Sequence, residues 1–214
     1  GVSSGSLRLQ AGADDGPGLS ATGISGAFLL NDKGVAGMLN IGAVALNQVT
    51  GLTLEVSNAA LLFNNTGVAA SASVGGNAFA FTQASQFDFL AVSGSVNLGL
   101  SLGGVSALVA GTFDFQRTIL SVNGASVTVL TLSISGGNTS IVAGGVTLGL
   151  SAINGGILIN DKGVAASLSV GTLAVSGVTG LTFVASDISL DFNSTGEAVS
   201  ASIGGRAFDF TGRD

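Results

Sequence analysis

The side chains best suited to chemistry in this sequence are its 12 carboxylates, because the chain contains neither His nor Cys. A calcium ion needs several converging oxygen ligands, usually from carboxylates and carbonyl groups. Two neighbouring Asp residues in AGADDGPG, and two in DISLDF, come closest to that arrangement. The candidate calcium ligands are therefore Asp14, Asp15, Asp187 and Asp191. Since the glycine-rich nonapeptide of calcium β-rolls is absent, the sequence predicts no cofactor, with calcium at these carboxylates as the alternative.

The absence of Cys and His excludes a thiol nucleophile, a Cys/His zinc site and a His-based catalytic triad. Two Asp–Lys pairs remain, Asp32 with Lys33 and Asp161 with Lys162. A Ser/Lys or two-carboxylate active site needs side chains that converge in a pocket, whereas these pairs occupy short turn segments. We therefore predict solvent-exposed turns at both places and no enzymatic activity.

The basic side chains are few and are spread along the whole chain. Lys plus Arg amounts to 6 residues against 12 acidic ones, and the formal net charge is −6. A protein that binds nucleic acid or anionic lipid needs clustered cations. Between Arg117 and Asp161 lie 43 uncharged residues, but Gly, Ser, Thr or Asn interrupts every few positions. A spanning helix needs about 20 mostly apolar residues. The sequence therefore predicts no nucleic-acid partner and no transmembrane segment.

A duplication with an offset of 129 residues dominates the sequence. The segment NDKGVA at 31–36 recurs at 160–165. Residues 22–82 align with 151–211 without a gap, and 33 of the 61 aligned positions are identical. Shared composition alone does not explain this identity, so we expect the same backbone in both copies.

A shorter echo at an offset of 33 residues lies inside each copy, because NDKGVAGMLNIG resembles NNTGVAASASVG and NDKGVAASLSVG resembles NSTGEAVSASIG. The chain therefore divides into an N-terminal segment, a first repeat block, a diverged block and a second copy of the first block. These four parts are 1–21, 22–84, 85–150 and 151–214.

Four Asn-x-x-Gly segments occupy matching positions in these repeats. Asn at the first position and Gly at the fourth is typical of a type I turn, which closes a hairpin when the Gly is left-handed. Apolar residues alternate on both sides, as in half-buried strands. The predicted fold is an all-β, elongated tandem antiparallel β-repeat with strands of about 5–9 residues. A parallel β-helix, with the turns as corners between coils, is the alternative. The predicted turn residues are Asn31, Gly34, Asn64, Gly67, Asn160, Gly163, Asn193 and Gly196.

Most of the 12 Phe residues form F-x-F pairs. On a strand, residues i and i+2 share a face, so each pair places two rings side by side. An exposed strip of rings would suit stacking on a sugar or base, but Phe lacks the polar group that such surfaces usually carry. We therefore predict a buried ladder made of Phe79, Phe81, Phe113, Phe115, Phe208 and Phe210.

The phrases GVAASLSVG, GVTGLTF, DFNSTG and SIGGRAFDF, repeated in tandem, resemble the β-repeat regions of very large bacterial secreted or cell-surface proteins. Such regions are described as adhesin-like or haemolysin-type calcium-binding. The resemblance covers residues 22–213 and implies an extracellular or cell-surface location and a structural or adhesive role.

The predicted function is therefore a structural module of an extracellular or cell-surface bacterial filament or matrix. We expect it to assemble with itself, head to tail, through β-strand edges, because the apolar strand at 205–211 has little charge to protect its edge. The alternative is an adhesin-type binding module with a calcium- or glycan-binding loop.

Overall fold

A computed structural model of the protein describes residues 1–10, 17–122, 125–203 and 206–210. The described chain is all-β apart from one short 3-10 turn, η1, and every strand pair in it is antiparallel. The antiparallel prediction is therefore confirmed, and a parallel β-helix is excluded. The elements are β1 (Val2–Gln10), β2 (Gly18–Asn31), β3 (Gly34–Asn47), β4 (Leu52–Asn64), β5 (Ala70–Val74), β6 (Asn77–Phe81), η1 (Ala84–Gln86), β7 (Phe89–Leu102), β8 (Val105–Val122), β9 (Ala125–Ala143), β10 (Val146–Asn160), β11 (Gly163–Val178), β12 (Leu181–Asn193), β13 (Ser200–Ile203) and β14 (Arg206–Asp209).

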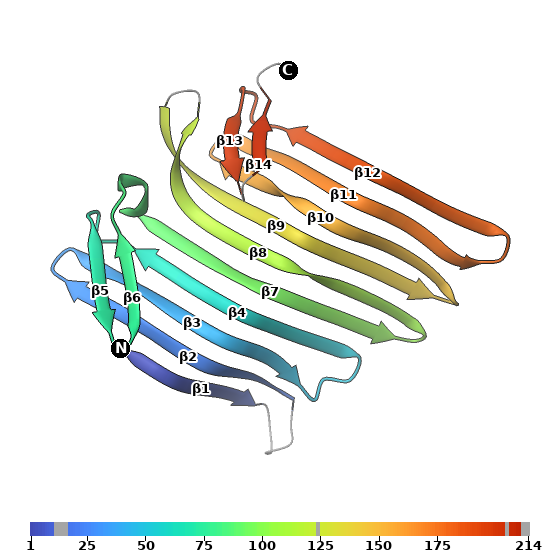
Figure 1. Cartoon of the computed structure of the whole chain (residues 1–214), viewed down its shortest axis with the longest axis horizontal. Coiled ribbons are helices and arrows are strands. Elements are labelled where there is room, and N and C mark those ends of the chain that lie inside the picture. Colours follow the sequence, from blue (N-terminus) through green and yellow to red (C-terminus); the bar gives the residue numbers. More distant parts are fainter. Residues whose placement is uncertain (11–16, 123–124, 204–205, 211–214) are drawn as a thin grey trace.

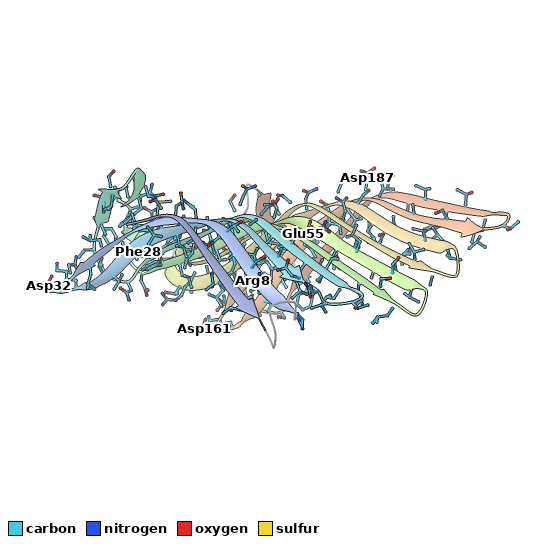
Figure 2. The ribbon with its side chains drawn as sticks, turned by 90° about the horizontal axis from the view of Figure 1, so that it is seen from below. Arg8, Phe28, Asp32, Glu55, Asp161 and Asp187 are labelled. Carbon is cyan, nitrogen blue, oxygen red and sulfur yellow. The ribbon has the colours of Figure 1, made fainter. Side chains whose placement is uncertain are left out.

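Ten of these strands form one open sheet in the order β1-β2-β3-β4-β7-β8-β9-β10-β11-β12. The order follows the chain, except that the hairpins β5–β6 and β13–β14 leave the sheet. Figure 1 shows the strands side by side, with both hairpins over one end of the sheet. Seen edge-on in Figure 2, the sheet is a single layer and both hairpins lie on the same side of it.

The strands of the large sheet are longer than predicted. Most have 13 or more residues, and β9 has 19. Gly within a strand was expected to end it, but several glycines sit at irregularities inside continuous strands. In β8, for example, the register shifts between Ala110 and Thr112, at Gly111. A bulge of this kind bends a strand without ending its pairing.

Two of the predicted Asn-x-x-Gly turns close hairpins. Asn31 pairs with Gly34 at the β2–β3 turn, and Asn160 pairs with Gly163 at the β10–β11 turn. In the first, Asn31 Oδ1 accepts hydrogen bonds from the backbone N–H groups of Lys33 and Gly34, at 2.9 and 3.1 Å. The Asn side chain thus fixes the turn, and Gly34 supplies the positive φ of 143°.

The other two turns are not hairpins, so that part of the prediction is wrong. Gly67 and Gly196 have positive φ as expected, at 69° and 67°, but the chain leaves the sheet here and enters the small hairpins. The reason is the third turn residue, because Asn64 Oδ1 accepts from both the N–H and the hydroxyl of Thr66, at 3.1 and 2.8 Å. This local network holds Asn64 at 1% exposed and replaces a hairpin pairing. Asn193 and Thr195 repeat it.

Each small hairpin covers a compact core on the sheet. Under β5–β6, Phe79 and Phe81 are buried with their ring centroids 5.5 Å apart, and both pack on Ala27 and Ala36. The second core, under β13–β14, contains Phe210 and the fully buried Leu158. Phe79, Phe81 and Phe210 are therefore core residues, as predicted. The side chain of Phe208 lies outside the described residues.

Phe113 and Phe115 are only half-buried, which corrects the prediction of a uniformly buried ladder. Both belong to β8, on the side of the sheet opposite the hairpins. No second layer of the described chain covers that side, so cross-strand neighbours are their main cover. Phe115, for instance, lies between Val92 and Leu132.

The strand registers of the two sequence copies agree. Leu29 pairs with Ala36 as Leu158 pairs with Ala165, and Thr22 pairs with Ala43 as Ser151 pairs with Thr172. These partners are related by the offset of 129, so β2–β3–β4 and β10–β11–β12 repeat one structure. In contrast, the echo at 33 residues relates a hairpin turn to a turn that leaves the sheet.

β1 occupies the place that β9 occupies in the second copy. Leu9 of β1 pairs with Leu19, and Ile141 of β9 pairs with Leu148, the equivalent of Leu19. The sheet therefore repeats after the six strands β1, β2, β3, β4, β7 and β8.

Candidate functional site

The predicted calcium ligands do not come together in the described structure. Asp14 and Asp15 lie outside the described residues. Asp187 and Asp191 are both exposed on β12, and Asp187 sits in a bulge with φ of 55°. Within the part of the chain that the structure describes, no group of three or more Asp, Glu, His or Cys side chains is placed to hold a metal ion.

A polar groove of 350 Å³ lies between β13 and the strands β8 and β9. Hydroxyl and amide groups dominate its lining, and Asp114 is the carboxylate among them, with Gln116 Nε2 donating to it at 2.7 Å. A groove of this kind offers hydrogen bonds, but its single carboxylate has no acid–base partner in the lining. The lining residues are Thr112, Asp114, Gln116, Thr118, Leu120, Thr131, Ser133, Ile134, Ser135, Ser202 and Ile203.

The Asp–Lys turn pairs lie at the tips of the two hairpins, where Asp32, Lys33, Asp161 and Lys162 are exposed. Lys162 pairs with Glu197, and the hydrogen bond to this carboxylate raises the pKa of Lys162. The equivalent of Glu197 in the first copy is Val68, so this contact belongs to the second copy alone. Both side chains are largely exposed, and nothing in their setting forms a pocket for a substrate.

An ion pair between Asp88 and Arg117 joins the start of β7 to β8. The hydrogen bond from the Arg117 guanidinium holds the pKa of the Asp88 carboxyl below its ordinary value. A depressed pKa means that the pair stabilises the fold above the unfolded-state pKa and loses this effect as the pH falls through the folded-state value.

We expect the fold to lose a small part of its stability below about pH 4, where Asp88 becomes protonated. The loss should be less than about 1 kcal/mol, because both side chains are about half exposed and water screens them. Urea unfolding across this pH range checks it, with Asp88→Asn as the control. A parent-minus-variant difference in unfolding free energy that does not shrink toward acid would contradict the role of this pair.

The large sheet has one apolar and one polar face. Residues directly opposite one another on neighbouring strands share a face, so the registers define rows across the sheet. One row across all ten strands is apolar throughout, made of Val2, Gly26, Leu39, Leu61, Val92, Phe115, Leu132, Ile157, Ala166 and Phe192. The neighbouring row, on the face with the hairpins, is made of Ser25, Asn40, Ala60, Ser93, Asp114, Ser133, Gly156, Ser167 and Asp191.

The apolar face is open over much of its area. Val92 is 46% exposed, Leu100 44% and Phe192 51%, although all three are large apolar side chains. Monomeric soluble proteins rarely expose contiguous apolar patches beyond about 300–600 Å², and larger patches mark interaction surfaces. This face is therefore a candidate contact surface.

The two edge strands of the sheet, β1 and β12, are the second candidate surface. An edge strand presents unpaired N–H and C=O groups along its free side, which can pair with another strand. The edge predicted at 205–211 is different, because β14 pairs with β13 in a hairpin on the polar face and is not part of the large sheet. Sequence reasoning therefore missed β12 as an edge.

None of the described segments forms a helix that is long and apolar enough to cross a bilayer. Comparison of the chain with known proteins finds no matching family model, no matching curated protein and no matching solved structure. The geometry of the sheet, with its apolar face and its two edges, is therefore what any functional interpretation has to rest on.

Proposed function

We propose that this chain is a structural module of an extracellular or cell-surface filament or matrix, assembled through β-strand edges. The observation that carries the proposal is the open single-layer sheet, whose strand pattern repeats after six strands. Units of such a repeat gain stability from their neighbours in the array and not from a closed core of their own.

The directions of the edge strands support head-to-tail assembly. Neighbouring strands are antiparallel throughout the ten-stranded sheet, so β1 and β12 run in opposite directions. A second copy placed with its β1 beside β12 then continues the antiparallel alternation and keeps the apolar face on the same side. Such a contact uses two different surfaces and does not close, so it propagates.

The apolar face supports assembly as well. A sheet with one apolar face needs a second layer to bury it, and stacked sheets pack about 10 Å apart. Two sheets of this protein meeting through their apolar faces would cover the exposed Val92, Leu100 and Phe192 side chains. Because charged residues make up only 8% of the chain, such contacts should resist salt.

Sedimentation velocity of the purified chain tests this proposal at micromolar concentrations, in low and in high salt. We expect concentration-dependent growth into elongated particles that persists in high salt, with negative-stain electron microscopy showing filaments or sheets. A single monomeric species at every concentration and salt level would contradict a structural role, and ligand-dependent melting of that monomer would favour a binding module.

A further inference from the structure

The strands β4 and β12 occupy the same place in the two copies, yet their outer edges differ. β7 covers the outer edge of β4, with Leu61 opposite Val92. The equivalent edge of β12 has no neighbouring strand in the described sheet. Leu61 and Phe63 of β4 are consequently half-buried, whereas their equivalents Leu190 and Phe192 are 59% and 51% exposed.

The turns that follow these two strands differ in the same way. In the first copy, Asn64 Nδ2 donates to the Gln86 carbonyl at 2.8 Å, and the Gly67 N–H donates to the Phe87 carbonyl at 3.0 Å. Both acceptors belong to the segment that leads into β7.

In the second copy the turn has the same internal bonds, because Asn193 Oδ1 accepts from the N–H and hydroxyl of Thr195 and Asn193 Nδ2 donates to the Glu197 carbonyl. Among the described residues, no carbonyl stands where those of Gln86 and Phe87 stand in the first copy. The turn is therefore formed before the segment that would complete it is present.

We propose that the outer edge of β12 and the Asn193–Gly196 turn form a docking site for an extended segment with the sequence pattern of residues 83–102, supplied by a further repeat of this type. The inference rests on the proposed structural function and specifies its contact. The offset of 129 sets the register, with Leu190 opposite the position of Val92 and Phe192 opposite that of Leu90.

The β4–β7 pair shows which features the incoming strand needs. Leu90 and Val92 lie on the apolar face, where they would cover the exposed Leu190 and Phe192. A Cβ at Gly99 would lie 2.5 Å from Thr53 Oγ1, so glycine is required opposite that threonine. β12 keeps the threonine as Thr182.

The other edge of the sheet selects a different strand. β1 stands in the place of β9, and the outer neighbour of β9 is β8. A segment of the 83–102 pattern therefore distinguishes the β12 edge from the β1 edge.

The test uses the full chain and a fluorescent synthetic peptide of residues 83–102, with binding followed by fluorescence anisotropy. We expect saturable binding that weakens about tenfold or more when Leu190 and Phe192 are both changed to Lys, because the ammonium groups oppose burial beside Leu and Val. Leu30→Lys is the matched control, because Leu30 is 78% exposed on an interior strand and should leave binding unchanged. Gly99→Val in the peptide should also weaken binding about tenfold or more.

Disulfide trapping tests the register, since the chain contains no Cys of its own. The pair of Leu62 and Ala91 predicts that an Asp191→Cys chain joins an Ala91→Cys peptide, whereas a Thr182→Cys chain does not. Circular dichroism confirms that each variant is folded. Equal trapping at both positions, or peptide binding unaffected by the Leu190 and Phe192 changes, would overturn the proposal.

The two proposals fail separately. If the chain stays monomeric in sedimentation but binds the peptide in the stated register, the filament proposal fails and the docking site stands. If the chain assembles, binds no peptide, and assembles equally well with Leu190 and Phe192 both changed to Lys, the docking site is wrong and assembly uses another surface.

Discussion

Replacing Gly155 with valine is expected to destabilise the protein by about 3 kcal/mol, because the side chain has no room beside the neighbouring strand. A Cβ at Gly155 would lie 2.3 Å from the Ser167 carbonyl oxygen and 2.8 Å from Leu168 Cα. Both atoms belong to the backbone of β11 and cannot move without breaking the β10–β11 pairing. The equivalent Gly26 is equally confined, with Met38 O at 2.5 Å.

Gly149→Val is the matched control, because Gly149 lies in the same strand with no atom within 4 Å of its Cβ position. A β-branched residue suits a strand, so this variant should be as stable as the parent within about 1 kcal/mol. Urea unfolding followed by circular dichroism measures both. If the two variants lost equal stability, the close approach of β10 and β11 would not be the cause.

Phe81→Ala is expected to cost about 3–5 kcal/mol, which is the usual range for removing a buried aromatic ring. Phe81 is 3% exposed, and its ring lies 5.5 Å from that of Phe79 and 5.9 Å from that of Phe89. The ring therefore ties the β5–β6 hairpin to the start of β7. Hydrogen exchange should show the amides of β5 and β6 losing protection before those of the large sheet.

Phe192→Ala provides the comparison, since this ring is 51% exposed on the edge strand β12. Its loss should cost about 1 kcal/mol or less in the monomer. Chemical denaturation of both variants under identical conditions gives the difference. Comparable losses would mean that the hairpin core contributes no more to the fold than the open face does.

The strands and hairpin turns were predictable because their signals are local. The alternation around NDKG identified the β2–β3 and β10–β11 hairpins, and Asn31 and Asn160 fix those turns through their own side chains. The segments NNTG and NSTG look alike, but Thr replaces Lys at the third position. The Thr66 hydroxyl bonds the preceding Asn and redirects the chain, so this residue was the signal that could have distinguished the two turns.

The number of layers was not predictable from the same signals. Alternation shows that one face of a strand is apolar, but it is the same whether that face is covered by a second sheet or left open. Phe113 and Phe115 therefore looked like core residues and are half-buried on the apolar face. The edge at β12 escaped prediction for a related reason, because pairing between distant strands such as β4 and β7 leaves no local mark.

The six-strand repeat also sets a length. Strands lie about 4.8 Å apart, so one repeat advances about 29 Å along the sheet. Because a small hairpin accompanies each copy on the polar face, a continued array would carry a row of protrusions at this interval on one side and none on the other. Oriented fibres should then diffract at about 4.8 Å and at a sixfold longer period, and the ribbon would measure distance in units of 129 residues.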